Sequence, residues 1–259
     1  MTKAPQLRAL PLFLATSALF VCTASTSFAG NISLNLTGWN QDLIAEKTAA
    51  NPASGTSTDF SGLDWYENGS PSTTLSGLPS SRTFVSSFNA ATTFQYQAYT
   101  GNNALVNSGT LTLAAPTTFS QLAFLTSAQG GGQTFNLVLH FQGGGTNTTL
   151  VGTDPDWTQS GNNAISNTGL VYRTSNWVAA EFNSNSISMF EHDYTLSGPD
   201  QARSITSIDF LKIGGGSEAL FAVSGTSTVT ATPEPLSFAL VGGGLLGLGL
   251  MRRSRVRSS

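Results

Sequence analysis

Cysteine is almost absent from this 259-residue chain, whose single cysteine is Cys22. A lone cysteine cannot close an intrachain disulfide, and a structural thiolate metal site needs several. The stability of the folded protein must therefore come from buried apolar side chains and backbone hydrogen bonds.

Charged side chains are also scarce, at 10% of residues. Between Gly30 and Thr232, five basic residues stand against 13 acidic ones, which gives this part a net charge of about −8. An acidic body with few scattered cations is a poor partner for nucleic acid, whose binding relies on basic patches. We expect no nucleic-acid partner, whereas divalent cations and neutral sugars are compatible with this charge.

Catalytic motifs are missing as well. There is no G-x-S-x-G nucleophile elbow and no H-E-x-x-H metal motif, and the only histidines are His140 and His192. We therefore expect a protein that is not an enzyme. Paired carboxylates for glycoside hydrolysis are recognised by their separation in space, so an extracellular glycan-active hydrolase stays as one alternative. A purely structural matrix component is the other.

The two histidines fall in segments that read as strands. His140 lies on the polar-leaning face of its segment, which predicts an exposed or loop-covered imidazole. Glu191, His192 and Asp193 are consecutive, and neighbours in a strand point to opposite faces, so the three cannot converge on one ion. Glu191 and Asp193 share a face, which is either solvated or invites a cation or an arginine.

The first 29 residues predict a secretory signal peptide. Lys3 and Arg8 form a basic start, an apolar stretch follows, and the segment ends in small residues at Ala29. This pattern predicts cleavage by signal peptidase between Ala29 and Gly30. Cys22 would leave with the leader, so the exported form would contain no cysteine.

The last 27 residues have three parts: Pro233-Glu234-Pro235, an apolar run over 236–251, and a basic end. Sixteen residues make a helix of about 24 Å, short of the ~30 Å hydrocarbon core, so the run predicts a marginal transmembrane segment that is held and then discarded. An uncleaved anchor is the alternative. The four arginines that follow should stop translocation on the cytoplasmic side; they are Arg252, Arg253, Arg255 and Arg257.

This tail resembles the PEP-CTERM sorting signal of Gram-negative bacteria, which is also catalogued as the C-terminal domain of ice-binding proteins. The resemblance implies processing by exosortase at the inner membrane, then residence at the cell surface or in an extracellular polysaccharide or biofilm matrix. Pro233, Glu234 and Pro235 would be the sorting motif that the enzyme reads. The ice-binding label does not extend to the body, which has no visible 20- to 50-residue repeat.

The body, residues 30–228, reads as an all-β domain followed by a linker over 229–232. Phe135, Leu137, Leu139 and Phe141 alternate with more polar residues between two glycine triplets, which is typical of a strand with one buried face. We predict a single antiparallel β-sandwich of jelly-roll type. Further strand-like runs are 32–36, 94–99, 105–113, 119–126, 170–173, 187–196, 205–213 and 218–223. Residues 42–50 predict a short helical turn, and 54–81 predict loops.

Several body segments resemble a module of galactose-binding-like fold in exported bacterial proteins. They are Gly38–Glu46, Gly77–Pro79, Tyr99–Leu105, Asp156-Trp157 and Leu220–Gly225. The resemblance implies a non-catalytic sandwich and, by fold analogy, carbohydrate binding.

The loop Asp154-Pro155-Asp156-Trp157 is the candidate ligand site. Its two carboxylates with loop carbonyls suit Ca²⁺, and a tryptophan face stacks on sugar rings. The alternative for Trp157 is a core plug at one end of the sandwich. No other cofactor is expected. A second acidic and aromatic group makes a weaker case: Asp59, Asp64, Trp65, Tyr66 and Glu67.

Overall fold

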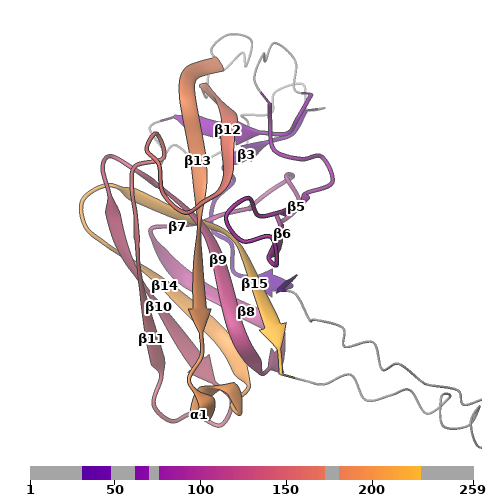
Figure 1. The fold of residues 1–259 in the computed structure, drawn as a ribbon, viewed down its shortest axis with the longest axis vertical. Coiled ribbons are helices and arrows are strands. Elements are labelled where there is room, and N and C mark those ends of the chain that lie inside the picture. Colours follow the sequence, from indigo (N-terminus) through magenta and orange to yellow (C-terminus); the bar gives the residue numbers. More distant parts are fainter. Residues whose placement is uncertain (1–30, 48–61, 70–75, 173–180, 229–259) are drawn as a thin grey trace, which may run out of the picture.

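The protein is described by a computed structural model, which defines residues 31–47, 62–69, 76–172 and 181–228. This part of the chain is all-β, as predicted, with two curled sheets and one four-residue helix (Figure 1). The predicted leader (with Ala29 and Gly30) and the sorting signal lie outside the described residues. Within those residues, no helix has the length and apolar character needed to span a membrane.

The larger sheet has eight strands, and β13 lies in the middle of their order. Its order is β1 (Ile32–Ser33), β15 (Ser217–Ser227), β9 (Phe119–Gln129), β13 (Glu181–Thr195), β12 (Asn163–Tyr172), β4 (Leu63–Tyr66) and β3 (Ile44–Ala45), and β7 (Leu105–Val106) also pairs with β15. All these pairs are antiparallel except β3 with β4, which run parallel. The antiparallel prediction therefore fails for this one edge pair.

The smaller sheet has five strands and packs face to face on the larger one. Its order is β11 (Thr148–Asp154), β10 (Gln133–Phe141), β14 (Ile205–Ile213), β8 (Ser108–Thr117) and β2 (Leu36–Thr37). A separate hairpin consists of β5 (Thr83–Val85) and β6 (Thr93–Gln95). The single helix, α1 (Gly198–Gln201), begins after Ser197, whose hydroxyl accepts a hydrogen bond from the Asp200 N–H.

Two hydrophobic clusters lie on opposite faces of the larger sheet. Leu122 and Phe124 of β9 belong to the cluster between the two sheets, together with the buried face of β10. Ala123 and Leu125 belong to a second cluster, which the β5–β6 side of the molecule and the N-terminal segments cover. Because both faces are covered, β9 is buried along most of its length, unlike a strand with one solvated face.

Two runs that read as single strands are divided between sheets. The run 105–113 becomes β7 in the larger sheet and β8 in the smaller one, and the break falls at Asn107, which has φ +61°. Asparagine tolerates this left-handed conformation better than most residues, and here it turns the chain from one sheet to the other. The run 32–36 divides in the same way into β1 and β2.

The predicted helical turn at 42–50 is wrong in its described part, where Ile44 and Ala45 form β3. Both residues are fully buried and pair with the parallel strand β4. Tertiary burial therefore overrides a weak local preference. Within the predicted loop region 54–81, Leu63–Tyr66 is likewise the buried strand β4.

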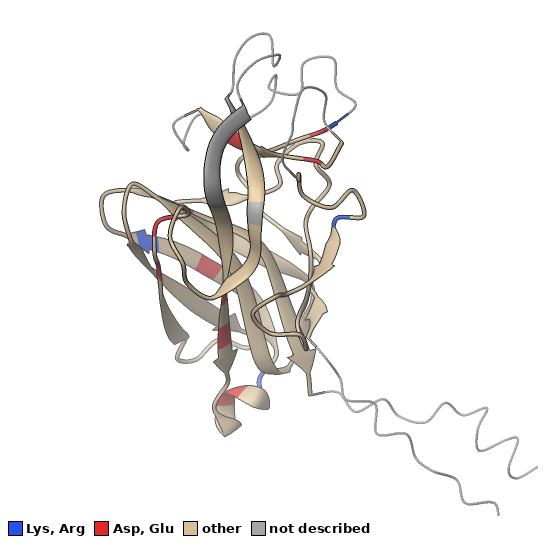
Figure 2. Ribbon diagram, turned by 45° about the horizontal axis from the view of Figure 1, so that its top comes forward, with Lys and Arg blue, Asp and Glu red and all other residues tan. Residues whose placement is uncertain are grey.

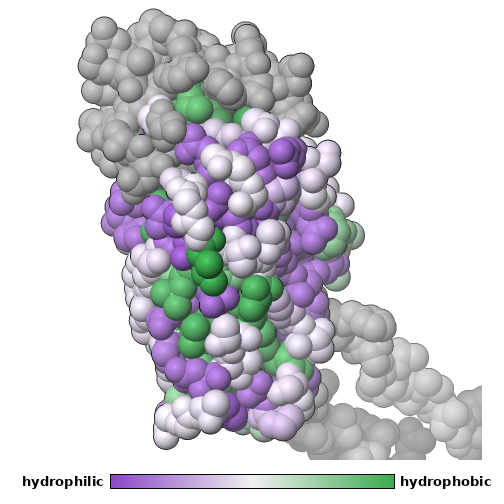
Figure 3. Space-filling model, turned by 90° about the vertical axis from the view of Figure 1, so that its left-hand side faces the viewer, coloured by the Kyte–Doolittle hydropathy of each residue, from purple (hydrophilic) through white to green (hydrophobic). Residues whose placement is uncertain are grey.

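The outer face of the smaller sheet is uncovered in the described structure (Figure 3). It carries the exposed apolar side chains Val151 and Leu211, which flank Asn136 in one row of the sheet. His140 lies on the same face, where its side chain is half-buried and Nε2 is 2.7 Å from Asp209 Oδ2; the prediction was an exposed or loop-covered imidazole. Charged residues are few and dispersed over the body (Figure 2).

Candidate functional site

The three predicted ligand residues do not converge on one site. Asp154 ends β11 and turns into the space between the sheets, where it is fully buried. Asp156 lies in the following turn, and Trp157 is 4% exposed in the cluster on the other face of the larger sheet. A Ca²⁺ ion could not be held by Asp154 and Asp156 together in this arrangement.

The Asp156 carboxylate links two turns through hydrogen bonds. Oδ2 accepts from the backbone N–H groups of Gly130 (3.1 Å) and Gly131 (3.0 Å), and Oδ1 accepts from the Thr158 hydroxyl (2.7 Å) and N–H (3.1 Å). Burial raises the pKa of Asp156, but these hydrogen bonds outweigh it and lower the pKa below its ordinary value. Both oxygens are thus occupied by groups of the protein itself.

The Trp157 ring packs inside the molecule. Its centroid lies 5.5 Å from that of Trp65 in an edge-to-face arrangement, and Trp65 contacts Phe221 in the same way at 4.9 Å. This is the geometry of the core plug that the sequence offered as an alternative. A ring enclosed in this way presents no face on which a sugar could stack.

Asp154 instead belongs to a buried polar network with His192 and Glu218. His192 Nε2 lies 2.5 Å from Asp154 Oδ1, and its ring meets Phe135 edge to face at 5.1 Å. Glu218 of β15 is fully buried, and its carboxyl oxygens have no N–H or O–H donor among the described residues. Burial, and then the neighbouring Asp154 carboxylate, raise the pKa of Glu218 well above its usual range, although Lys212 lowers it in part.

The raised pKa favours the protonated form of Glu218, whose O–H can donate to the neighbouring Asp154 carboxylate. The result is a chain from Glu218 through Asp154 to His192. A shallow cavity of about 420 Å³ lies above it, lined by Gly132, Thr153, Asp154, Pro155, Ser160, Gly161, Asn162 and His192.

The network has the base and the orienting carboxylate of a hydrolytic site but lacks the rest of one. Among the described residues, Asp154 is the only hydrogen-bond partner of the His192 ring, so no hydroxyl nucleophile is hydrogen-bonded to the imidazole. Glycosidases keep their two carboxyl groups about 5 Å or more apart across an open groove, whereas Glu218 is fully buried beside Asp154. The described part of the chain also contains no group of three or more His, Cys, Asp or Glu side chains suited to a metal ion.

A second carboxyl pair lies on the opposite face of β13. Glu191 and Asp193 share this face, as predicted, while His192 points between the sheets. Asn89 Nδ2 donates to Asp193 Oδ2 at 2.8 Å. Burial raises the pKa of Glu191 to about 7; the Ser86 and Thr92 hydroxyls lower it in part, and Asp193 raises it further. The Asn89 amide and the raised pKa of Glu191 are thus found where the sequence suggested a solvated face, a cation or an arginine.

Glu218 was not identified as a site residue from the sequence, because it lies 64 positions from Asp154 in a run that reads as an ordinary strand. One signal was present for Asp154. Leu150, Gly152 and Asp154 share one face of β11, which alternates with Val151 and Thr153, and this period of two puts Asp154 on the inward face. An inward carboxylate requires a buried partner, although the sequence does not say which one.

No known protein-family model matches this chain, and no curated protein matches it either.

Proposed function

We propose that the protein is an exported, non-catalytic β-sandwich protein of jelly-roll type, sorted through its PEP-CTERM-like tail. It would be displayed at the bacterial cell surface or released into the extracellular polysaccharide matrix. The observation that carries this proposal is the order of parts in residues 233–259: a Pro-Glu-Pro motif, a short apolar run and four arginines.

Three features of the body are compatible with this role. The described core contains no cysteine, so its stability does not depend on the redox state of the compartment. The first and last described strands, β1 and β15, pair with each other, so both ends of the body leave it on the same side. Among the described residues, no serine or threonine hydroxyl is hydrogen-bonded to the His192 ring, which supports a role other than catalysis.

The test is the intact mass of the protein recovered outside cells that contain an exosortase. We expect a chain that begins at Gly30 and lacks the residues after the sorting motif. Replacing Pro233, Glu234 and Pro235 together by alanine should leave a longer, membrane-retained form. A matched control replaces Thr230 and Thr232 by alanine and should be processed normally. An exported species that still carries 236–259 would refute the sorting proposal.

A further inference from the structure

Arg82 is distinguished from the other cations in the described part of the chain. Three of the four are held by partners in the body: Lys47 by Glu67 (3.5 Å), Arg203 by Asp200 (3.2 Å) and Lys212 by the Gly214 carbonyl (2.9 Å). The guanidinium of Arg82 makes no hydrogen bond or ion pair with any described residue, although it is half-buried. In a body with a net charge of about −8, a guanidinium that pairs with none of the described carboxylates suggests a role in binding.

The backbone at Arg82 is strained. Its φ of +61° lies in the left-handed region, where glycine is favoured and a long side chain is uncommon. The conformation is fixed from both sides, because the Arg82 N–H donates to the Pro79 carbonyl and the Arg82 carbonyl accepts from the Tyr96 N–H, each at 2.8 Å. Glycine would fit this position with less strain, so arginine is not there for the fold.

A polar cavity of about 320 Å³ lies beside this turn. Its lining residues are Ser33, Leu34, Asn35, Arg82, Gln95, Tyr96 and Gln97. The side-chain amides of Asn35, Gln95 and Gln97 make no hydrogen bond with any described residue, and no carboxylate lines the cavity. One guanidinium and three amides are therefore available to a ligand from one hollow.

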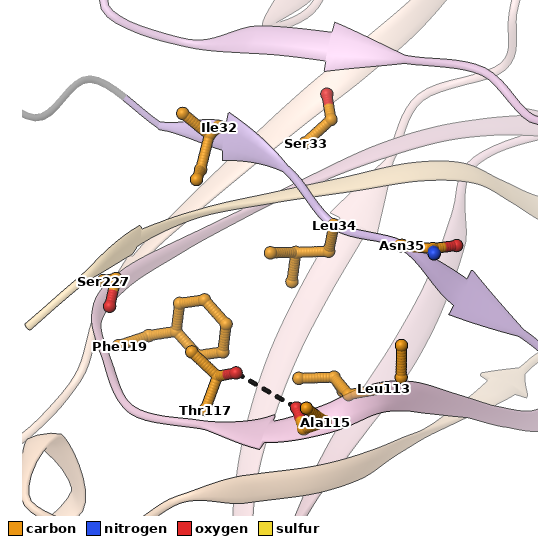
Figure 4. Close-up of a pocket in the computed structure, with 10 residues that line it drawn as sticks. Ile32, Ser33, Leu34, Asn35, Leu113, Ala115, Thr117, Phe119 and Ser227 are labelled. Atoms are coloured by element: carbon orange, nitrogen blue, oxygen red, sulfur yellow. Dashed lines mark hydrogen bonds between the residues drawn. The ribbon is translucent and has the colours of Figure 1, made fainter. Parts of the chain in front are cut away.

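The N-terminal segment separates this cavity from an apolar one. In the apolar cavity, Leu34 and Ile32 gather with Leu113 and Phe119, whereas Ser33 points away from it (Figure 4). Because side chains alternate along an extended segment, this segment has one apolar side and one polar side. The polar side, with the β5–β6 hairpin opposite, forms the Arg82 cavity.

We propose that the Arg82 cavity binds a carboxylate-bearing sugar unit of an acidic polysaccharide. A guanidinium is planar and presents paired N–H donors that match a carboxylate, while side-chain amides donate to and accept from sugar hydroxyls. A single cation among amides suits one carboxylate within an otherwise neutral, hydroxyl-rich ligand. The inference rests on the proposed function for the source of its ligand, an extracellular polysaccharide.

The test is calorimetric titration of the exported protein with tetragalacturonate, beside the same oligosaccharide after reduction of its carboxyl groups. We expect the acidic form to bind, the reduced form to bind at least tenfold more weakly, and the affinity to fall as ionic strength rises. Arg82→Gln should weaken binding at least tenfold. Arg82→Gly should do the same while leaving the melting temperature unchanged or higher, because it relieves the left-handed strain.

Arg203→Gln is the matched control, since it removes the same unit of charge beside α1 and should change the affinity less than twofold. Equal binding of the reduced oligosaccharide, or undiminished binding by Arg82→Gln, would overturn the proposal. So would sulfate or phosphate binding as tightly as the oligosaccharide, because the cavity would then be a simple anion site. The binding test and the mass test can fail separately. A processed protein that does not bind tetragalacturonate would refute only the binding proposal, and an unprocessed protein that binds it would refute only the sorting proposal.

Discussion

The stability of the body should fall as the pH rises through the neutral range. Burial raises the pKa of Glu191 to about 7 in the folded state, whereas an unfolded chain releases this proton near pH 4.5. Between these values the folded state holds one more proton than the unfolded state, so each rise in pH favours unfolding. The pKa of Glu218 is raised as well, and its contribution has the same sign.

One extra proton gives a slope of about 1.4 kcal/mol per pH unit, or about 3 kcal/mol over the window from pH 4.5 to 7. Both carboxyl oxygens of Glu191 are shielded from solvent, so screening by water reduces this figure little. On the acid side, hydrogen bonds hold the pKa values of Asp156, Asp200 and Asp209 below normal, so their stabilisation is lost as the pH falls below about 4. The stability maximum should therefore lie near pH 4 to 5.

The assay is urea unfolding at intervals from pH 4 to 8. Glu191→Gln mimics the protonated side chain, so it should flatten the decline between pH 5 and 7 and make the protein more stable than wild type at pH 8. Glu46→Gln changes the net charge by the same amount and serves as the control. A free energy of unfolding that rises from pH 5 to 7, or an unchanged slope in Glu191→Gln, would refute the assignment of a raised pKa to the buried Glu191.

Three further predictions concern packing and turns. Trp157→Ala should lower the free energy of unfolding by about 3 to 5 kcal/mol, because it opens a cavity against Trp65. If urea unfolding shows a loss under 1 kcal/mol, the ring is not enclosed. Gly152→Ala would put a Cβ 2.2 Å from the Phe135 ring and should cost about 1 to 3 kcal/mol, whereas Gly215→Ala meets nothing within 4 Å and should be nearly neutral by the same assay. Asp156→Asn should cost about 2 kcal/mol at pH 7, since the charged acceptor of two glycine N–H groups is lost. The cost should shrink as the pH falls below the ordinary pKa of an aspartate, and a cost that does not depend on pH in this range would contradict the role of the charge.

The sequence predicted those parts of the fold whose pattern is local. Ile205–Ile213 is a strand with the predicted bounds, and the alternation in Phe135–Phe141 matches its burial. Strand β11 was missed, because Gly152 interrupts its apolar pattern and is there to accommodate the Phe135 ring of the neighbouring strand. No local pattern reports a contact of that kind.

The candidate sites depended even more on distant contacts. The sequence selected Asp154 for its loop, but the structure joins it to His192 and Glu218, which come from two other strands. Arg82 has no motif around it, and its left-handed backbone and polar cavity exist only once the N-terminal segment lies opposite the hairpin. Residue type alone could not distinguish it from the paired cations.

The pairing of β15 with β1, β7 and β9 also constrains when the body can close. Ribosomes and export channels both deliver the N-terminus first, yet β15, which lies between β1 and β9 in the larger sheet, is the last strand to be made in the described part of the chain. Until Ser227 has emerged, β1 has no neighbour in that sheet and β9 has an open edge. Assembly of the body is thus delayed until the residues that precede the tail are free, and a chain stopped short of them would expose a long strand edge to its neighbours.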